Sequence, residues 1–262
     1  VSDGGISLRF TADIHEATYT RVAGNGFEEN DEVGVFALVG SSTMKEERYA
    51  DNLRFFRTSE KVFESSEPIY YPDDEVTLRL ISYYPYQEEG VNMGESTMSV
   101  AVETDQNLSA GYFCSDFLVA SQNLQSAPKG AIALHYDHKF FKLKIALVGK
   151  EGEELQGILD TDPKLSVCGF YTKAIYDFQK ETYSAFSNEK SITPAGKWEI
   201  QGNRLSGKEV ILIPQETTLG YQYIVLEVGG KIYTSPLPSS LQLQSGKQSE
   251  LAISFIPTED VL

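Results

Sequence analysis

Histidine and aspartate residues near the middle of the sequence have the spacing that comes nearest to a metal site. In the run His135-Tyr136-Asp137-His138, His135 and Asp137 stand two residues apart, and this spacing puts both side chains on one face of a strand. Such a pair offers a nitrogen and an oxygen ligand to one metal ion. No third ligand is identifiable in the sequence. We therefore favour a histidine that forms hydrogen bonds at the end of a strand, and we expect neither a metal nor a cofactor.

The motifs of nucleophilic and zinc-dependent catalysis are incomplete in this sequence. Gly94-Glu95-Ser96-Thr97-Met98 lacks the second glycine of a nucleophile elbow. His15-Glu16 begins a zinc-protease motif, but Tyr19 stands where the second histidine is needed. The chain has three histidines in all, which leaves little acid–base chemistry near neutral pH. The sequence predicts a protein that is not an enzyme.

Tyrosines cluster beside prolines in two short stretches, residues 69–72 and 83–86. Exposed aromatic rings combine an apolar face with a polar tip and stack on sugar rings. Tyr83, Tyr84 and Tyr86 are therefore candidate glycan contacts. Packing of the Tyr-Pro segments at strand ends is the alternative, and it is the one we favour.

The two cysteines, Cys114 and Cys168, both stand in apolar surroundings. We favour two separate buried thiols, and a single disulfide is the alternative. Neither cysteine has the spacing of a metal or redox motif, so cysteine usage does not fix the cellular compartment.

The chain is strongly acidic, because 22 Lys and Arg residues face 38 Asp and Glu residues and give a net charge of −16. Such a chain repels phosphate backbones and anionic lipid, which argues against nucleic-acid and membrane-surface binding. No apolar run approaches the roughly 18–20 residues that cross a bilayer. Residues 1–5 have neither the charged nor the apolar region of a signal peptide, so we expect an export segment upstream of Val1.

Apolar and polar residues alternate with a period of two along residues 6–14. This period predicts a strand with one buried face, whereas a helix would need apolar residues three and four apart. The apolar residues that this strand would turn toward a core are Ile6, Leu8, Phe10, Ala12 and Ile14.

Similar stretches recur about every ten residues along the chain and are separated by turn residues, a pattern typical of β-sandwiches. Gly229-Gly230 lies between two such stretches and predicts a two-residue hairpin turn. The only helix candidate, residues 116–124, is short. Residues 149–154 interrupt the pattern with charge and glycine near the middle of the chain. We therefore predict an all-β protein with two domains, residues 1–149 and 150–262.

Several of these stretches resemble the fimbrillin family, the type V pilins and pilin-like surface proteins of Gram-negative anaerobes. One of them, Asp31-Glu32-Val33-Gly34-Val35-Phe36, is similar to a D-x-I-G-V-F run of that family. The similar segments follow the family's order over nearly the whole chain. They are residues 6–12, 20–28, 31–36, 68–72, 82–86, 115–120, 138–143, 213–215 and 245–251.

The resemblance implies a fold and a place in the cell. It implies two transthyretin-like Greek-key β-sandwich domains, export as a lipoprotein through a cysteine upstream of Val1, and assembly on the outer membrane or in surface fimbriae.

The resemblance also implies a route of assembly. Family members polymerise after a trypsin-like protease cuts behind an arginine and removes the first strand, so that a strand from another subunit fills the groove. By position, the arginine would be Arg21 and the displaceable strand would be the one over residues 6–14. An ordinary exposed loop arginine is the alternative for Arg21. Leu251, Ile253 and Phe255 have the alternation of a donor strand, or belong to the protein's own last strand.

Together these observations favour a non-enzymatic fimbrillin-like pilus subunit with a structural or adhesive role. Its expected partners are other pilin subunits, with a host protein or glycan as a receptor, and the membrane only through the upstream lipid anchor. The alternative is a cell-surface glycan-binding module that uses the tyrosine-rich loops.

Overall fold

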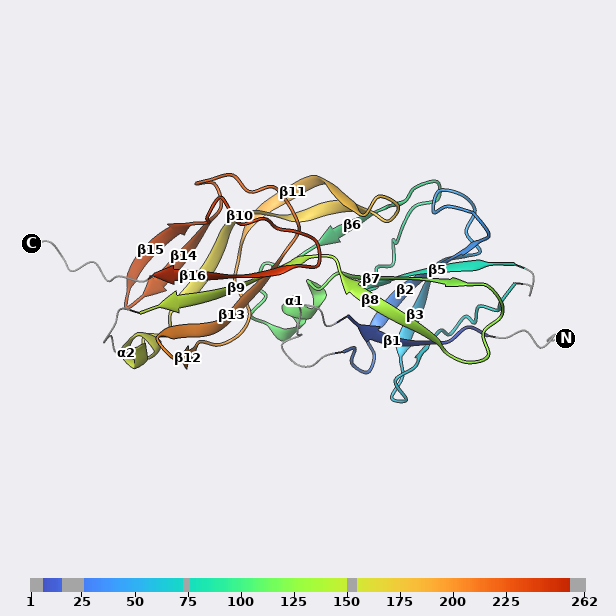
Figure 1. Ribbon diagram of the computed structural model, residues 1–262, viewed down its shortest axis with the longest axis horizontal. Helices are drawn as coiled ribbons and strands as arrows, with labels where there is room; N and C mark the ends of the chain where they lie inside the picture. Colours follow the sequence, from blue (N-terminus) through green and yellow to red (C-terminus); the bar gives the residue numbers. More distant parts are fainter. Residues whose placement is uncertain (1–6, 16–25, 73–75, 150–154, 255–262) are drawn as a thin grey trace, which may run out of the picture. The chain divides into compact units, whose positions relative to one another are not determined.

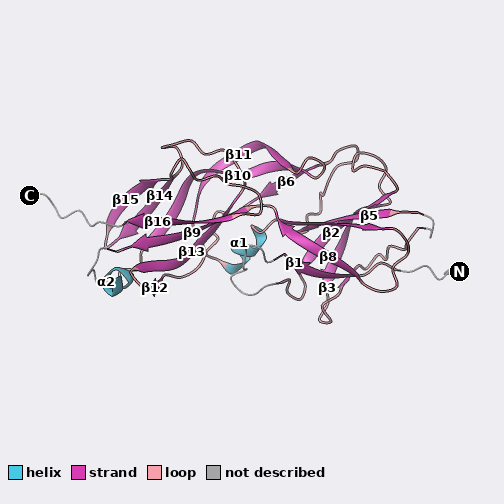
Figure 2. Cartoon of the chain, viewed as in Figure 1, coloured by secondary structure: helices cyan, strands magenta, loops and turns pink. Residues whose placement is uncertain are grey.

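The chain is built almost entirely from strands. The computed structural model describes residues 7–15, 26–72, 76–149 and 155–254 (Figure 1). Within these ranges it has sixteen strands and two short helices, α1 (Ser109–Cys114) and α2 (Leu155–Leu159) (Figure 2). The all-β prediction is confirmed. In the described part of the chain, no helix is both long and apolar enough to cross a membrane.

The chain divides into two compact units, and each unit is assembled from three separate stretches. The first unit comprises residues 1–100, 116–139 and 175–185, and the second comprises residues 101–115, 140–174 and 186–262. The units therefore interleave along the sequence, and a cut at residue 149 falls inside the second unit. That residues 1–149 and 150–262 are domains able to fold separately stays a prediction.

Seven strands of the first unit form one closed sheet, in the order β1-β4-β3-β2-β5-β7-β8. They are β1 (Phe10–Ile14), β2 (Glu32–Val39), β3 (Ala50–Arg57), β4 (Phe63–Glu64), β5 (Leu78–Tyr84), β7 (Leu118–Leu124) and β8 (Ile132–His138). β1 closes the ring, because it pairs antiparallel with β4 and parallel with β8. The first unit thus has one closed sheet where a sandwich has two separate sheets.

Aromatic and aliphatic side chains fill the inside of this closed sheet. The ring of Phe27 lies edge-on to Phe63, Tyr84 and Tyr136, with ring centroids 5.0 to 5.5 Å apart. Tyr136 is fully buried and shares a hydrogen bond with Ser82, at 2.6 Å between the hydroxyl oxygens. Burial raises the pKa of the Tyr136 hydroxyl, because the phenolate would lose its hydration. The phenol therefore stays neutral and donates or accepts within this polar pair.

The one helix candidate of the sequence, residues 116–124, is a strand in the structure. β7 pairs antiparallel with β5 along its whole length and with β8 at its start. Leu118, Val119 and Ala120 are buried in succession, which requires cover on both faces of the strand. Pairing in the sheet overrides the local helical tendency of this segment.

The second unit is built around two sheets. One has the order β11-β10-β14-β15, with β6 also paired to β10, and the other has the order β12-β13-β9-β16. The strands are β6 (Thr97–Ala101), β9 (Phe141–Val148), β10 (Lys164–Asp177), β11 (Thr182–Ile192), β12 (Glu199–Gln201), β13 (Arg204–Leu212), β14 (Tyr223–Val228), β15 (Lys231–Pro236) and β16 (Gln248–Ser254). β6, β10 and β11 contain residues of both units.

The predicted hairpin turn at Gly229-Gly230 is confirmed. Val228 and Lys231 are register partners in the antiparallel pair β14–β15. The two glycines between them have φ of 56° and 78°, a region that residues with a Cβ rarely adopt. Glycine is therefore required by the backbone of this turn.

Candidate functional site

The first strand that the structure describes, β1, belongs to the first unit. The predicted strand over residues 6–14 is shorter in the structure, where β1 begins at Phe10. Upstream of it, Ser7 forms an isolated bridge with Tyr70, and the backbone N–H of Leu8 donates to the carbonyl of Ile69 at 2.8 Å. Ile6 and Arg21 lie outside the described residues.

The apolar residues of this segment point into the closed sheet, as their alternation predicts. Leu8, Phe10 and Ile14 are buried, and Ala12 is partly buried against the same core. The Phe10 ring packs against that of Phe55, with 4.7 Å between the centroids. β1 thus supplies a row of side chains to the core of the first unit.

The backbone of β1 is bonded mostly to one neighbour. Its parallel register with β8 runs from Phe10↔Ile132 to Ile14↔Tyr136, and the flanking N–H of His15 donates to the carbonyl of Tyr136 at 2.9 Å. With β4, the register partners among the described residues are limited to Phe10↔Phe63. A strand that left this position would expose the edge of β8 and the apolar core beneath it.

The outward face of β1 meets β8 through two pairs of polar side chains. Nδ1 of His135 lies 2.6 Å from Oδ1 of Asp13, and Nδ1 of His15 lies 2.9 Å from Oδ1 of Asp137. The two imidazole rings stack at 5.7 Å with an angle of 6° between their planes. Of the residues with metal-ligand spacing, His135 therefore binds Asp13 of β1 and Asp137 binds His15, which follows β1 directly. The described residues contain no group of three side chains suited to hold a metal ion.

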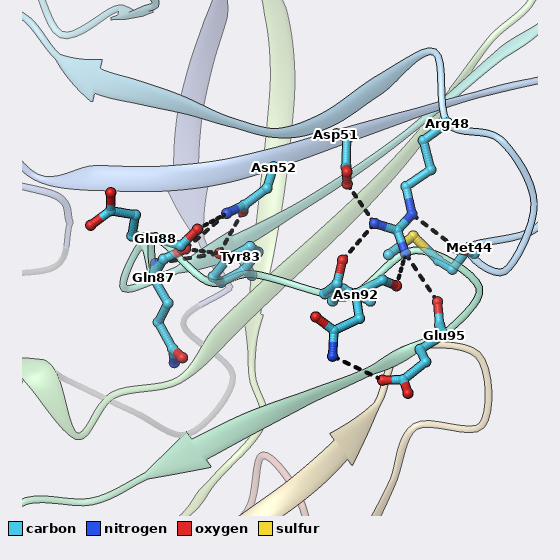
Figure 3. A network of polar contacts seen from close by, with 10 residues as sticks. Met44, Arg48, Asp51, Asn52, Tyr83, Gln87, Glu88, Asn92 and Glu95 are labelled. Carbon is cyan, nitrogen blue, oxygen red and sulfur yellow. Dashed lines mark hydrogen bonds and ion pairs between the residues drawn. The ribbon is translucent and has the colours of Figure 1, made fainter.

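The candidate glycan contacts fit the packing alternative better than a sugar site. Tyr83 and Tyr84 are buried, so neither ring offers a face for stacking, and this part of the glycan interpretation is corrected. The Tyr83 hydroxyl donates to Oδ1 of Asn52 at 2.7 Å (Figure 3), and burial raises the pKa of this hydroxyl. Tyr86 is half-buried, with the Arg54 guanidinium 5.9 Å from its ring centroid.

Arg48 organises a polar network that the sequence does not reveal (Figure 3). Its side chain is fully enclosed and forms an ion pair with Asp51. Its guanidinium also donates to four backbone carbonyls at 2.7 to 3.0 Å, those of Met44, Val91, Asn92 and Glu95. The arginine therefore fixes the loop at residues 91–95 to the segment 44–51. Nothing in the local sequence distinguishes it from the exposed arginines of the chain.

The two cysteines form no disulfide. Cys168 is buried, and its Sγ lies 3.3 Å from Oγ of Ser191. Cys114 is exposed, because it ends the short helix α1, whose buried residue is Tyr112. The interpretation of two separate thiols is therefore confirmed, and the expectation that Cys114 is buried is wrong.

Solved structures with the same fold come from Bacteroides. A candidate cell adhesion protein of Bacteroides uniformis is 19% identical, with a TM-score of 0.67 and coverage of 97% of this chain and 94% of the other. A second, from Bacteroides ovatus, is 14% identical, with a TM-score of 0.72 and coverage of 96% and 93%. A fimbrial protein of Bacteroides vulgatus is 17% identical, with a TM-score of 0.55 and coverage of 94% and 95%.

The family comparison agrees with the resemblance seen in the sequence. No curated protein matches the chain. A sequence model of the family described as fimbrillin-like matches residues 20–262, which is nearly the whole chain. The chain therefore belongs to the fimbrillin-like family.

Proposed function

We propose that this protein is a non-enzymatic subunit of surface fimbriae and that it assembles by exchange of its first strand. Cleavage behind Arg21 would separate β1 from the rest of the chain, and a strand from another subunit would then take its place. The observation that carries this proposal is the position of β1, which fills the core of a closed sheet but is bonded mainly to the edge of β8. Addition of a strand to such an edge provides backbone hydrogen bonds and alternate side-chain pockets.

The energetics suit a strand that stays in place until it is displaced. Burial of Leu8, Phe10 and Ile14 in the core stabilises the bound strand, together with its backbone hydrogen bonds to β8. The loss of conformational freedom in the ordered segment opposes this gain. A donor strand with the same alternation would replace β1 with little net change in free energy.

The family and the neighbouring structures support a surface role. The Bacteroides vulgatus neighbour is a fimbrial protein, and its fold is shared over nearly the whole chain. We infer a cell-surface or extracellular location, with other pilin subunits as partners and a host protein or glycan as receptor. A lipid anchor in the outer membrane belongs to the same proposal.

The proposed architecture is two transthyretin-like Greek-key domains. The two sheets of the second unit support it, whereas the first unit has a single closed sheet. The glycan-binding alternative has no support from Tyr83 and Tyr84, because both are buried.

Limited digestion of the intact chain with a trypsin-like protease tests the proposal. Mass spectrometry should detect cleavage after Arg21, and native gels of the cut chain mixed with a second pilin subunit should then show oligomers, because the cut frees β1 to be replaced by a strand of that subunit. Arg21→Ala should abolish both effects. Lys129→Ala removes a protease site in an exposed loop of the same unit and should change neither. A chain that is cut after Arg21 but stays monomeric at high concentration would exclude self-polymerisation by strand exchange.

A further inference from the structure

On the solvent-facing side, Asp13 of β1 and the adjacent His15 each meet a polar side chain of β8. Asp13 is the direct register partner of His135, and the next outward pair joins His15 to Asp137. Because an ionised carboxylate only accepts hydrogen bonds, Nδ1 of each imidazole must donate. From the N-terminal to the C-terminal end, the β1 side has Asp13 and then His15, whereas β8 has His135 and then Asp137.

This crossed order fixes the register of the strand as well as its face. A slip of one residue would turn every apolar side chain of β1 outward, so the buried core excludes it. A slip of two residues keeps the apolar face inward, but it brings Asp13 opposite Asp137 or His15 opposite His135. Two carboxylates directly opposite each other repel, and two opposed imidazoles would each lose the carboxylate acceptor that they have in the observed register. The apolar alternation disfavours odd slips, and the polar pairs disfavour a slip of two residues in either direction.

The neighbouring groups on β7 and β4 do not compete for the Asp13–His135 and His15–Asp137 pairs. On β7, the register partner of Asp137 is Val119, which is uncharged. The buried Tyr176 lies close enough for the Asp137 carboxylate to help raise the pKa of its hydroxyl, after burial itself. At the other end of β1, Arg9 lies 3.7 Å from Glu64 of β4. Within the described ranges, the acidic and imidazole side chains that join the outer faces of β1 and β8 are thus Asp13, His15, His135 and Asp137.

We propose that the edge of β8 selects the strand that replaces β1 by the order of its imidazole and carboxylate side chains, His135 and then Asp137. The occupant is a strand of another protein subunit with a carboxylate opposite His135 and an imidazole or other base opposite Asp137, between alternating apolar residues. This inference rests on the proposed function, strand exchange at the β1 position, and names the chemistry of the partner.

The last strand of this chain does not meet these requirements. Within β16, a match of Glu250 to the position of Asp13 puts Leu251 at Ile14 but puts Ala252 opposite Asp137. The same match carries Lys247 to the buried position of Phe10. Glu250 also has its own ion partner, since Nη1 of Arg204 lies 2.6 Å from its Oε1. The charge order therefore favours a strand from a different protein over β16 of a second copy.

Labelled peptides test this selection on the full chain after cleavage behind Arg21. A fluorescent peptide with the sequence of residues 6–15 should enter the cleaved protein, and a peptide with Asp13→His and His15→Asp should bind about tenfold more weakly. A protein with His135→Asp and Asp137→His should reverse this preference. A Thr11→Ser peptide changes an outward uncharged residue and serves as the control. A peptide of residues 245–254 should bind more weakly than that of residues 6–15.

Each outcome decides a different point. Equal binding of the original and swapped peptides to both proteins would overturn charge selection and leave strand exchange standing. Tighter binding of the peptide of residues 245–254 would make a second copy the partner and overturn the proposal. If no peptide enters, strand exchange fails, and a double-mutant cycle of Asp13→Ala and His135→Ala in the uncleaved chain decides whether the pair holds β1. That cycle should show coupling of about twofold to fivefold in the unfolding equilibrium constant, and strict additivity would overturn the selection.

Discussion

Arg48 is a residue whose role follows from its surroundings in the folded chain. Its guanidinium has no exposed surface and meets four main-chain carbonyls and the Asp51 carboxylate. The ring of Phe36 lies 5.3 Å away. Carbonyl groups enclosed in this way need a donor, because an unpaired buried polar group costs as much as a lost hydrogen bond. The arginine therefore holds the loop at residues 91–95 against the first unit.

We expect Arg48→Ala to lower the free energy of unfolding by about 2–4 kcal/mol, because it leaves several enclosed carbonyls without a donor. Urea denaturation followed by circular dichroism measures the change. Arg54→Ala is the matched control, because Arg54 is largely exposed and its ion pair with Glu32 is accessible to water. Equal effects of the two substitutions would show that the Arg48 network does not stabilise the loop.

The polar pairs of β1 show what residue-level reasoning from the sequence misses. The alternation over residues 6–14 predicts which side chains of β1 are buried, because a period of two follows from strand geometry alone. The partners of Asp13 and His15 lie 122 positions away along the chain. No local pattern relates such distant residues, so the sequence favoured a hydrogen-bonding histidine but could not name its partner on β1.

At the scale of elements, alternation predicted strands well where one face is buried and poorly where both are. β1 and β8 alternate clearly in burial, and the two-glycine turn fixes the β14–β15 hairpin. The start of β7 is buried on both faces, so its apolar run is compatible with a short helix until its partners are known. Pairing between strands that are distant in the sequence, including the parallel contact of β1 with β8, depends on the assembled sheet and had no signal in the sequence.

The anchoring of β1 should depend on its inward residues much more than on its outward uncharged one. We expect Phe10→Ala to cost about 3–5 kcal/mol, because a buried aromatic ring against Phe55 leaves a cavity. Thr11→Ala should stay within about 0.5 kcal/mol, because Thr11 is exposed. Chemical denaturation measures both variants. After cleavage behind Arg21, the Phe10→Ala segment should also separate faster on gel filtration, and equal retention would show that the core does not hold the strand.

At the scale of the whole molecule, segments that are consecutive along the chain do not always belong to the same unit. β9 lies before residue 149, yet it pairs antiparallel with β13 and parallel with β16, which both come after it. Its side chains Leu143, Ile145 and Leu147 are at most 2% exposed. The glycine and charged residues at 149–154 predicted a domain boundary there. Composition does not indicate which strands pair across that segment.

Cutting the chain at residues 150–154 tests whether residues 1–149 and 150–262 are independent domains. We expect a protein with a site-specific protease sequence in place of these residues to remain in one piece on gel filtration after cleavage and to separate only in denaturant. The reason is that β9 keeps its backbone hydrogen bonds to β13 and β16 when the connection is cut, together with the apolar side chains buried between them. Residues 1–149 produced alone should aggregate, because β9 would then expose two unpaired edges. Two folded fragments that part without denaturant would instead establish residues 1–149 and 150–262 as independent domains.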